Sequence, residues 1–174
     1  VASAFCNDDV TLIVDSGPPM GSQFLAPCLQ KHMVETWGLN GTLPADCADC
    51  RPADGAFAEP YVRYILGKYP ESTLGLISTE SDETISQFWG FGENNCASLT
   101  GAPDPYPAGK YKQGLEDLRD RIIAGQGNFK LFMVPGSEHV LLDNDPTSVV
   151  VGGVTLKDWL NKALTGDPTW SNVP

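Results

Sequence analysis

Three short apolar runs constrain the fold more than any other feature of this sequence. They are VTLIVD (10–15), STLGLIST (72–79) and FKLFMV (129–134). None shows the strict alternation of apolar and polar residues that marks a strand with one face in water. Continuous runs of this length are typical of parallel strands that are covered on both faces. The sequence therefore predicts a parallel sheet with helices packed on each side.

The segments between these runs carry helix signals. Apolar residues at helical spacing, prolines near helix starts and glycines near helix ends predict helices within 20–38, 57–70, 111–127 and 155–166. Thr155 is the expected N-cap of the last helix. The order of strands and helices is that of the C-terminal half of a doubly wound, mostly parallel α/β sheet. We expect residues 1–174 to form one part of a single domain.

Charge and hydropathy exclude several classes of partner. The net charge is −11, whereas nucleic acids and anionic membranes are bound by clustered Lys and Arg. Apolar residues make up 41% of the chain, enough for a core, but no apolar run approaches the ~18 residues of a membrane span. We therefore expect no nucleic-acid partner and no membrane span.

The five cysteines favour disulfides over a metal site. They are Cys6, Cys28, Cys47, Cys50 and Cys96. The CADC pair at 47–50 is open to interpretation as a zinc or redox motif, but no second pair completes a zinc site and no strand precedes it. Disulfides indicate an oxidising compartment, so we expect a secreted or periplasmic protein. Because five is odd, one cysteine is left over or pairs outside the chain, and Cys6 is a candidate.

The cysteine-containing region 21–57 and the acidic segment 143–146 give further expectations. Region 21–57 is expected to be a disulfide-stabilised, cap-like excursion, or else a surface excursion that disulfides merely stabilise. The acidic DNDP segment at 143–146 lacks the spacing of a calcium loop. We assign no metal and no cofactor.

Candidate catalytic residues follow the second and third apolar runs. Asp82 lies in the turn after the second run and His139 lies after the third. In open α/β sheets, chemistry occurs beyond the carboxyl ends of the strands. An acid followed by a histidine in this order is the late part of the Ser, Asp or Glu, His triad of α/β-hydrolases. The alternatives are an N-cap role for Asp82, an ordinary surface histidine, and Glu80 or Glu83 as rival acids.

The nucleophile of such a triad is missing from the sequence. The G-x-S-x-G elbow on which it should lie does not occur, and Ser16, although it follows a strand, is flanked by Asp15 and prolines that do not form an elbow. We therefore expect the chain to begin after the elbow, with residues 1–5 as the tail of the following helix. The serine and most of the oxyanion hole would then lie on a preceding segment or a separate chain.

Several motifs, taken in order, resemble one family. They are LIVDSGPPM, the segment ending CADC, STESDETISQFWGFG, VPGSEHVLL and TLKDWLNKALTGDPTWSNVP. Together they are similar to the pectin acetylesterase family, which includes Notum-like carboxylesterases and secreted bacterial members, and the bacterial branch looks closest.

The resemblance implies an α/β-hydrolase fold and a serine esterase activity. The family's catalytic acid then falls on Asp82 and its catalytic histidine on His139. The family's aspartate-serine-glycine segment falls on Asp15 to Gly17, so Asp15 and Ser16 are expected to shape the substrate site. The absent elbow is the departure from the family pattern.

The aromatic residues Phe88 and Trp89 have two interpretations. They line an acyl or sugar pocket, or they pack in the core. The expected function is a carboxylic ester hydrolase that removes short acyl groups, such as acetyl, from a polysaccharide or a similar ester. The alternatives are a thioesterase, peptidase or polyester hydrolase on the same fold, and an inactive or non-enzymatic binding domain.

Overall fold

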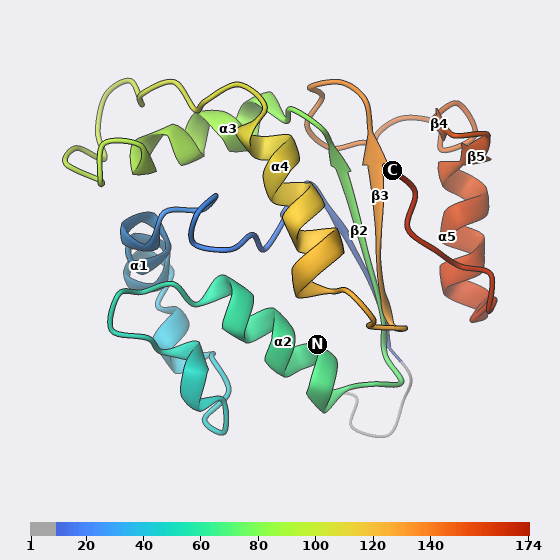
Figure 1. Ribbon diagram of the computed structural model, residues 1–174, viewed down its shortest axis with the longest axis horizontal. Helices are drawn as coiled ribbons and strands as arrows, with labels where there is room; N and C mark the ends of the chain where they lie inside the picture. Colours follow the sequence, from blue (N-terminus) through green and yellow to red (C-terminus); the bar gives the residue numbers. More distant parts are fainter. Residues whose placement is uncertain (1–9) are drawn as a thin grey trace.

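The computed structural model describes residues 10–174 and contains the predicted parallel sheet (Figure 1). Its strands are β1 (Thr11–Asp15), β2 (Thr73–Thr79) and β3 (Phe129–Val134), in the spatial order β1-β2-β3. Both pairs of neighbours are parallel, so the carboxyl ends of all three strands meet at one edge. The prediction of an α/β architecture is confirmed at this level.

Helices lie on both faces of the sheet. Figure 1 shows α2 and α4 on one face and α5 on the other. The helices are α1 (Pro27–Thr36), α2 (Ala58–Lys68), α3 (Glu83–Trp89), α4 (Lys110–Asp117) and α5 (Leu156–Thr165). The 3-10 turns are η2 (Leu39–Gly41), η3 (Ala48–Cys50) and η4 (Gly90–Gly92). The turn η5 (Leu118–Ile122) is π-helical. A second, two-stranded sheet is formed by β4 (Val150–Val151), which pairs with β5 (Val154–Thr155).

Successive residues of the central strand supply two separate cores. Leu76 of β2 packs in one cluster with Leu66 of α2 and Leu115 of α4. Its neighbour Ile77 packs in the other cluster with Trp159 of α5. Because side chains alternate along a strand, this division shows that β2 is covered on both faces, as its uninterrupted apolar sequence predicts.

The helix boundaries follow local chemistry. α1 begins at Pro27, where the missing N–H costs nothing, so the residues before it in the predicted 20–38 segment are not helical. The segment predicted at 111–127 is α4 followed by η5. α5 begins after Thr155, whose Oγ1 accepts the backbone N–H of Asp158 at 3.0 Å. The N-cap prediction for Thr155 is confirmed.

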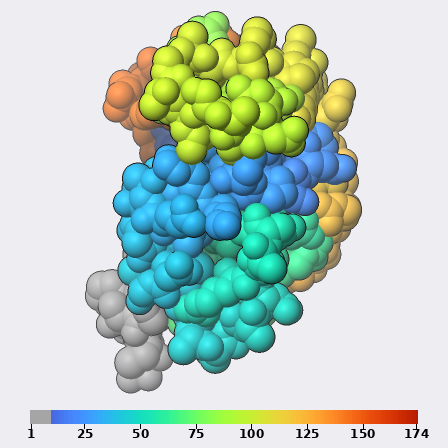
Figure 2. Space-filling view, turned by 90° about the vertical axis from the view of Figure 1, so that its left-hand side faces the viewer, coloured from blue at the N-terminus to red at the C-terminus, as the bar shows by residue number. Residues whose placement is uncertain are grey.

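Two disulfides stabilise the excursion at 21–57. Cys28 of α1 is bonded to Cys96, and Cys47 is bonded to Cys50, so the CADC pair forms a disulfide rather than a zinc ligand pair in this structure. Figure 1 shows α1 on the other side of α4 from the strands and below the level of their carboxyl ends. Figure 2 shows this excursion beneath the segment around Cys96 on the same face of the molecule. Cys6 lies outside the described residues, as do residues 1–5.

The two edges of the sheet differ. The outer edge of β3 is covered by the end of the chain, because Phe132 bridges Val173 and Met133 donates its N–H to the carbonyl of Val173 at 2.9 Å. β1 pairs only with β2 among residues 10–174, and Thr11 and Leu12 are exposed.

Within residues 10–174, no helix combines the length and apolar character needed to cross a bilayer.

Candidate functional site

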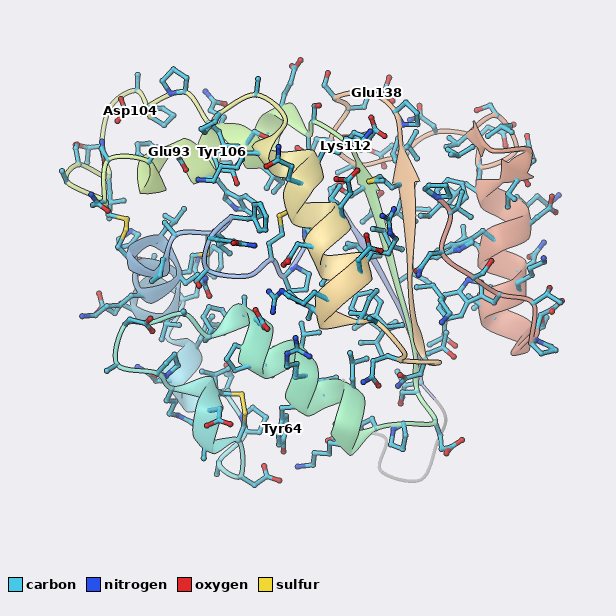
Figure 3. The ribbon with its side chains drawn as sticks, in the orientation of Figure 1. Tyr64, Glu93, Asp104, Tyr106, Lys112 and Glu138 are labelled. Carbon is cyan, nitrogen blue, oxygen red and sulfur yellow. A yellow bond between two sulfur atoms is a disulfide. The ribbon has the colours of Figure 1, made fainter. Side chains whose placement is uncertain are left out.

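The segments that follow the three parallel strands meet at the carboxyl edge of the sheet. Asp15 ends β1, Asp82 lies in the turn after β2, and His139 lies in the loop after β3. We call residues 136–142 the His139 loop. Figure 3 labels Glu138 of this loop at the top of the sheet. The edge where the sequence predicts chemistry is therefore where these side chains gather.

Asp82 and His139 are directly hydrogen-bonded. Nδ1 of His139 lies 2.9 Å from Oδ2 of Asp82. A carboxylate can only accept, so Nδ1 donates and the ring presents Nε2 as its free acceptor. The Asp82 side chain is completely buried, whereas the imidazole is 34% exposed. The pair thus consists of a shielded acid and a ring whose far nitrogen can reach a substrate.

Asp82 also caps the helix that follows it. Its Oδ1 accepts the backbone N–H of Ile85 at 2.8 Å, which fixes the carboxylate at the start of α3. The two interpretations of Asp82, N-cap and partner of the histidine, are therefore both met, each by a different oxygen. A residue that caps a helix has few rotamers left, and this holds Oδ2 toward the imidazole.

The rival acids of the same turn are engaged elsewhere. Glu80 forms an ion pair with Lys112 at 2.8 Å. Glu83 accepts the hydroxyl of Ser137 at 2.9 Å. Neither glutamate is hydrogen-bonded to His139, so the geometry selects Asp82 among the three candidate acids.

Backbone and side-chain bonds from β2 and its turn hold the first half of the His139 loop. Ser81 and Glu83 donate their N–H groups to the carbonyls of Gly136 and Ser137, each at 3.0 Å. Thr79 donates its hydroxyl to the carbonyl of Glu138 at 2.7 Å. Nothing in the sequence marks Thr79 for this contact except its position as the last residue of β2.

Asp15 and Ser16 contact the second half of the same loop. Ser16 Oγ donates to Oδ1 of Asp15 at 3.1 Å and accepts the N–H of Val140 at 3.1 Å. Oδ2 of Asp15 accepts the N–H of Leu142 at 2.8 Å. Ser16 is only 2% exposed. The structure brings both residues to the site, but their polar atoms face protein backbone rather than an open cavity.

The two aromatic candidates lie in different environments. Trp89 is 5% exposed and packs in the core against Tyr106 and Tyr111, with ring centroids 5.9 and 5.3 Å apart. Phe88 is 57% exposed. Of the two, only Phe88 therefore offers a ring face to a ligand.

The other histidine and the nearby serines are hydrogen-bonded to partners other than Nε2 of His139. His32 lies on α1, where its ring nitrogen is 3.3 Å from the hydroxyl of Thr36. The hydroxyls of Ser16 and Ser137 bond to Asp15 and Glu83. Among residues 10–174, no serine is hydrogen-bonded to Nε2 of His139.

A buried tyrosine lies beneath the site. The hydroxyl of Tyr111 is 3.1 Å from Oγ of Ser78, on β2. Burial raises the pKa of Tyr111; the hydrogen bond with Ser78 opposes this shift, and the nearby carboxylate of Asp82 adds a smaller rise. Tyr111 is therefore a neutral, protonated group throughout the ordinary pH range.

A hollow of about 530 Å³ lies next to this edge, between the first turns of α3 and the proline-rich segment 102–109. Ser81 and Glu83, the chain neighbours of Asp82, are among its lining residues. Figure 3 labels Asp104 and Tyr106 of the proline-rich segment.

Within the described part of the chain, no three His, Cys, Asp or Glu side chains are grouped so that they could hold a metal ion.

No protein-family model matches the chain, and neither a curated protein nor a solved structure matches it.

Proposed function

We propose that this chain is the C-terminal part of a secreted serine carboxylic ester hydrolase with the α/β-hydrolase fold. The hydrogen bond between buried Asp82 and half-exposed His139, at the carboxyl edge of a parallel sheet, carries the proposal. The order of an acid after one strand and a histidine after the adjacent strand is that of an α/β-hydrolase triad. The two disulfides support an oxidising compartment.

In this proposal His139 acts as base and then as acid. Its Nε2 takes the proton from a serine hydroxyl as the serine oxygen bonds to the ester carbon. It then returns that proton to the alcohol oxygen as the carbon–oxygen bond of the ester breaks. Asp82 keeps Nδ1 as the donor and stabilises the imidazolium. Water repeats the sequence on the acyl-enzyme and releases the acid.

The nucleophile is proposed to lie on a preceding segment or a separate chain that pairs with β1. The sheet supports this proposal, because β3 is covered at its outer edge while β1 carries an apolar run with Leu12 exposed. Among residues 10–174 β1 is an edge strand, and the unpaired backbone groups of an edge favour pairing, so an additional strand beside β1 would cover this edge. Backbone amides of that segment would hold the oxyanion, where losing one donor typically costs ~10²–10³ in rate.

The proposed substrate is an acetylated polysaccharide or a similar short-chain ester, and no cofactor is required. This choice rests on the resemblance to pectin acetylesterases, because a fold does not determine a substrate. A thioesterase, peptidase or polyester hydrolase would use the same Asp82 and His139. The absence of a serine bonded to Nε2 of His139 within residues 10–174 favours an inactive binding domain as the second candidate.

A fluorophosphonate probe tests the proposal. The purified protein is treated with the probe, reduced and measured by intact mass. We expect a label on a serine of a preceding segment or of a co-purifying polypeptide, and loss of the label in the His139→Ala variant. A label on Ser16 would overturn the proposed location of the nucleophile. No label on any component would favour the binding domain.

A further inference from the structure

The strongest signal outside the Asp82–His139 pair is backbone strain on both sides of one hydrogen bond. Among the non-glycine residues from 10 to 174, positive φ occurs at Ser16, Asn95, Cys96 and Val140. Asn95 and Cys96 are neighbours in one loop, and asparagine adopts this conformation readily. Ser16 and Val140, with φ of 65° and 59°, are bonded to each other through Ser16 Oγ and Val140 N.

Positive φ is especially unfavourable for Val140, because its side chain is branched at Cβ. Such conformations persist only where the surrounding structure holds them, and they concentrate at functional sites. The direct support here is the hydroxyl of Ser16, which accepts the N–H of the strained residue itself. Ser16 is in turn held by β2, because its own N–H donates to the carbonyl of Ile77 at 2.8 Å.

His139 is consequently held from both sides along the chain. The carbonyl of Glu138, just before it, accepts the hydroxyl of Thr79 from β2. The N–H of Val140, just after it, donates to Ser16 beyond β1. Asp15 adds a third bond through the N–H of Leu142. Residues at the ends of two neighbouring strands therefore hold the backbone on both sides of the imidazole.

We infer that Asp15 and Ser16 are positioning residues that hold the His139 loop so that the imidazole meets Asp82, and that they do not bind substrate. This inference rests on the proposed function for its catalytic meaning, but the contacts that it invokes are independent of any activity. Both oxygens of Asp15 and the hydroxyl of Ser16 are already engaged with the protein. A small displacement of a catalytic group is sufficient to cost a large factor in rate.

The burial of Leu141 is the competing explanation for the position of the loop. Leu141 is 2% exposed and packs in the core of α5 with Phe132. If this apolar contact alone held the loop, the bonds to Asp15 and Ser16 would be redundant. The experiment must therefore remove the polar contacts and leave Leu141 in place.

The test uses variants that remove the acceptors without straining the backbone. Ser16→Gly deletes the hydroxyl at a positive φ that glycine adopts freely. Asp15→Ala removes both oxygens, whereas Asp15→Asn keeps one oxygen for the N–H of Leu142 and should restore part of the effect. Ser78→Ala is the control, because Ser78 is also a fully buried hydroxyl at this sheet and bonds to Tyr111 and to the carbonyl of Thr79, with no bond to the His139 loop itself.

Three readouts are made on the chain together with the preceding segment or co-purifying polypeptide that carries the proposed nucleophile. They are the amide exchange of the two loop residues, the imidazole Nδ1 proton resonance of His139, and kcat and KM for a short acyl ester. In Ser16→Gly we expect the Val140 amide to exchange about 10-fold faster, as for loss of one hydrogen bond. We expect the Nδ1 resonance to broaden, and kcat to fall by about 10-fold at nearly constant KM. Asp15→Ala should affect Leu142 in the same way, and Ser78→Ala should change none of these readouts.

Two outcomes would overturn the inference. Unchanged exchange at Val140 and Leu142 would show that Leu141 holds the loop. Faster exchange with an unchanged Nδ1 resonance would show that the bonds are structural and do not position the imidazole. If the unmodified protein turns over no ester even together with the segment or polypeptide that carries the proposed nucleophile, the proposed function fails, and exchange together with the Nδ1 resonance still decides the positioning role.

Discussion

Nδ1 of His139 lies 2.9 Å from Oδ2 of Asp82, although 57 positions separate the two residues in the sequence. The contact arises because adjacent parallel strands end at the same edge, so that the turns following β2 and β3 are neighbours. The same aspartate caps α3 through its other oxygen. One side chain thus joins a local structural role to a long-range contact, and substitutions can separate the two.

Replacement of His139 by alanine should abolish catalysis with little effect on folding. Loss of the base of a triad lowers turnover by about 10⁴-fold or more. The imidazole is 34% exposed, so its removal leaves no large cavity. Ester hydrolysis and thermal unfolding measure the two effects, and His32→Ala on α1 is the control. A His139→Ala variant with native turnover would refute the triad.

Two replacements of Asp82 should separate its helix-capping role from the catalytic role that we propose for it. Asp82→Asn keeps an oxygen for the N–H of Ile85 but no longer stabilises an imidazolium, so turnover should fall by about 10⁴-fold. Asp82→Ala should lose turnover and also about 1 kcal/mol of stability, the usual value of an N-cap. Denaturant unfolding and kinetics on both variants check this. Equal stabilities would contradict the capping role.

Phe88 and Trp89 should respond in opposite ways. Trp89→Ala removes a buried ring and should lower the free energy of unfolding by about 3–5 kcal/mol. Phe88→Ala alters an exposed ring and should change stability by no more than about 0.5 kcal/mol. If Phe88 lines the substrate site, its replacement raises KM. An unchanged KM would remove Phe88 from the site and leave both residues without a role in binding.

The two disulfides should differ in what they contribute. By loop entropy, Cys28–Cys96, with a sequence separation of 68, stabilises by about 4 kcal/mol, and Cys47–Cys50, with a separation of 3, by about 1.5 kcal/mol. Paired Cys→Ala variants under denaturant unfolding measure both values, each serving as the control for the other. A larger loss at Cys47–Cys50 would show that local packing outweighs loop closure.

Acid should remove the stabilising effect of Glu59. Arg121, which contacts both carboxylate oxygens at 2.7 and 2.8 Å, lowers the pKa of Glu59 below its ordinary 4.5; burial opposes this shift and Arg63 adds to it. A lowered pKa stabilises the folded state fully above pH 4.5, and this contribution is lost as the pH falls through the folded value.

Glu59→Gln should therefore be less stable than the native protein near neutral pH, and the difference should shrink as the pH falls below 4.5. Denaturant midpoints from pH 7 to pH 3 measure it. Glu71→Gln is the control, since Glu71 is exposed and forms no ion pair with the described residues. A difference that stays constant with pH would mean that the ion pairs with Arg121 and Arg63 are not its cause.

The sequence predicted the elements of this fold well where local chemistry decides them. The apolar runs became β1, β2 and β3, and Thr155 caps α5 as expected. Asp82 and His139 were expected after adjacent strands, and both lie there; their catalytic roles stay a prediction. The helix predicted within 20–38 forms only from Pro27 onward, because a proline is compatible with a helix only at its start.

The residues that only the tertiary structure revealed share a different property. Thr79 and the bond between Ser16 and Val140 carry no sequence period or spacing that predicts their partners. The pairing of Cys28 with Cys96 likewise could not be read from the positions of the cysteines. Each of these contacts joins segments far apart in the chain.

The sequence by itself therefore determined the strands, the bounds of α2 and α5, and the edge at which an acid and a histidine should lie. The tertiary structure alone decided that Asp82 rather than Glu80 or Glu83 meets His139, that Trp89 is buried, and that Asp15 and Ser16 face the His139 loop. The physical reason is the distance along the chain over which each interaction acts. Side-chain periodicity and helix caps act over a few residues and leave a pattern in the sequence, whereas contacts between loops depend on how whole strands and helices pack.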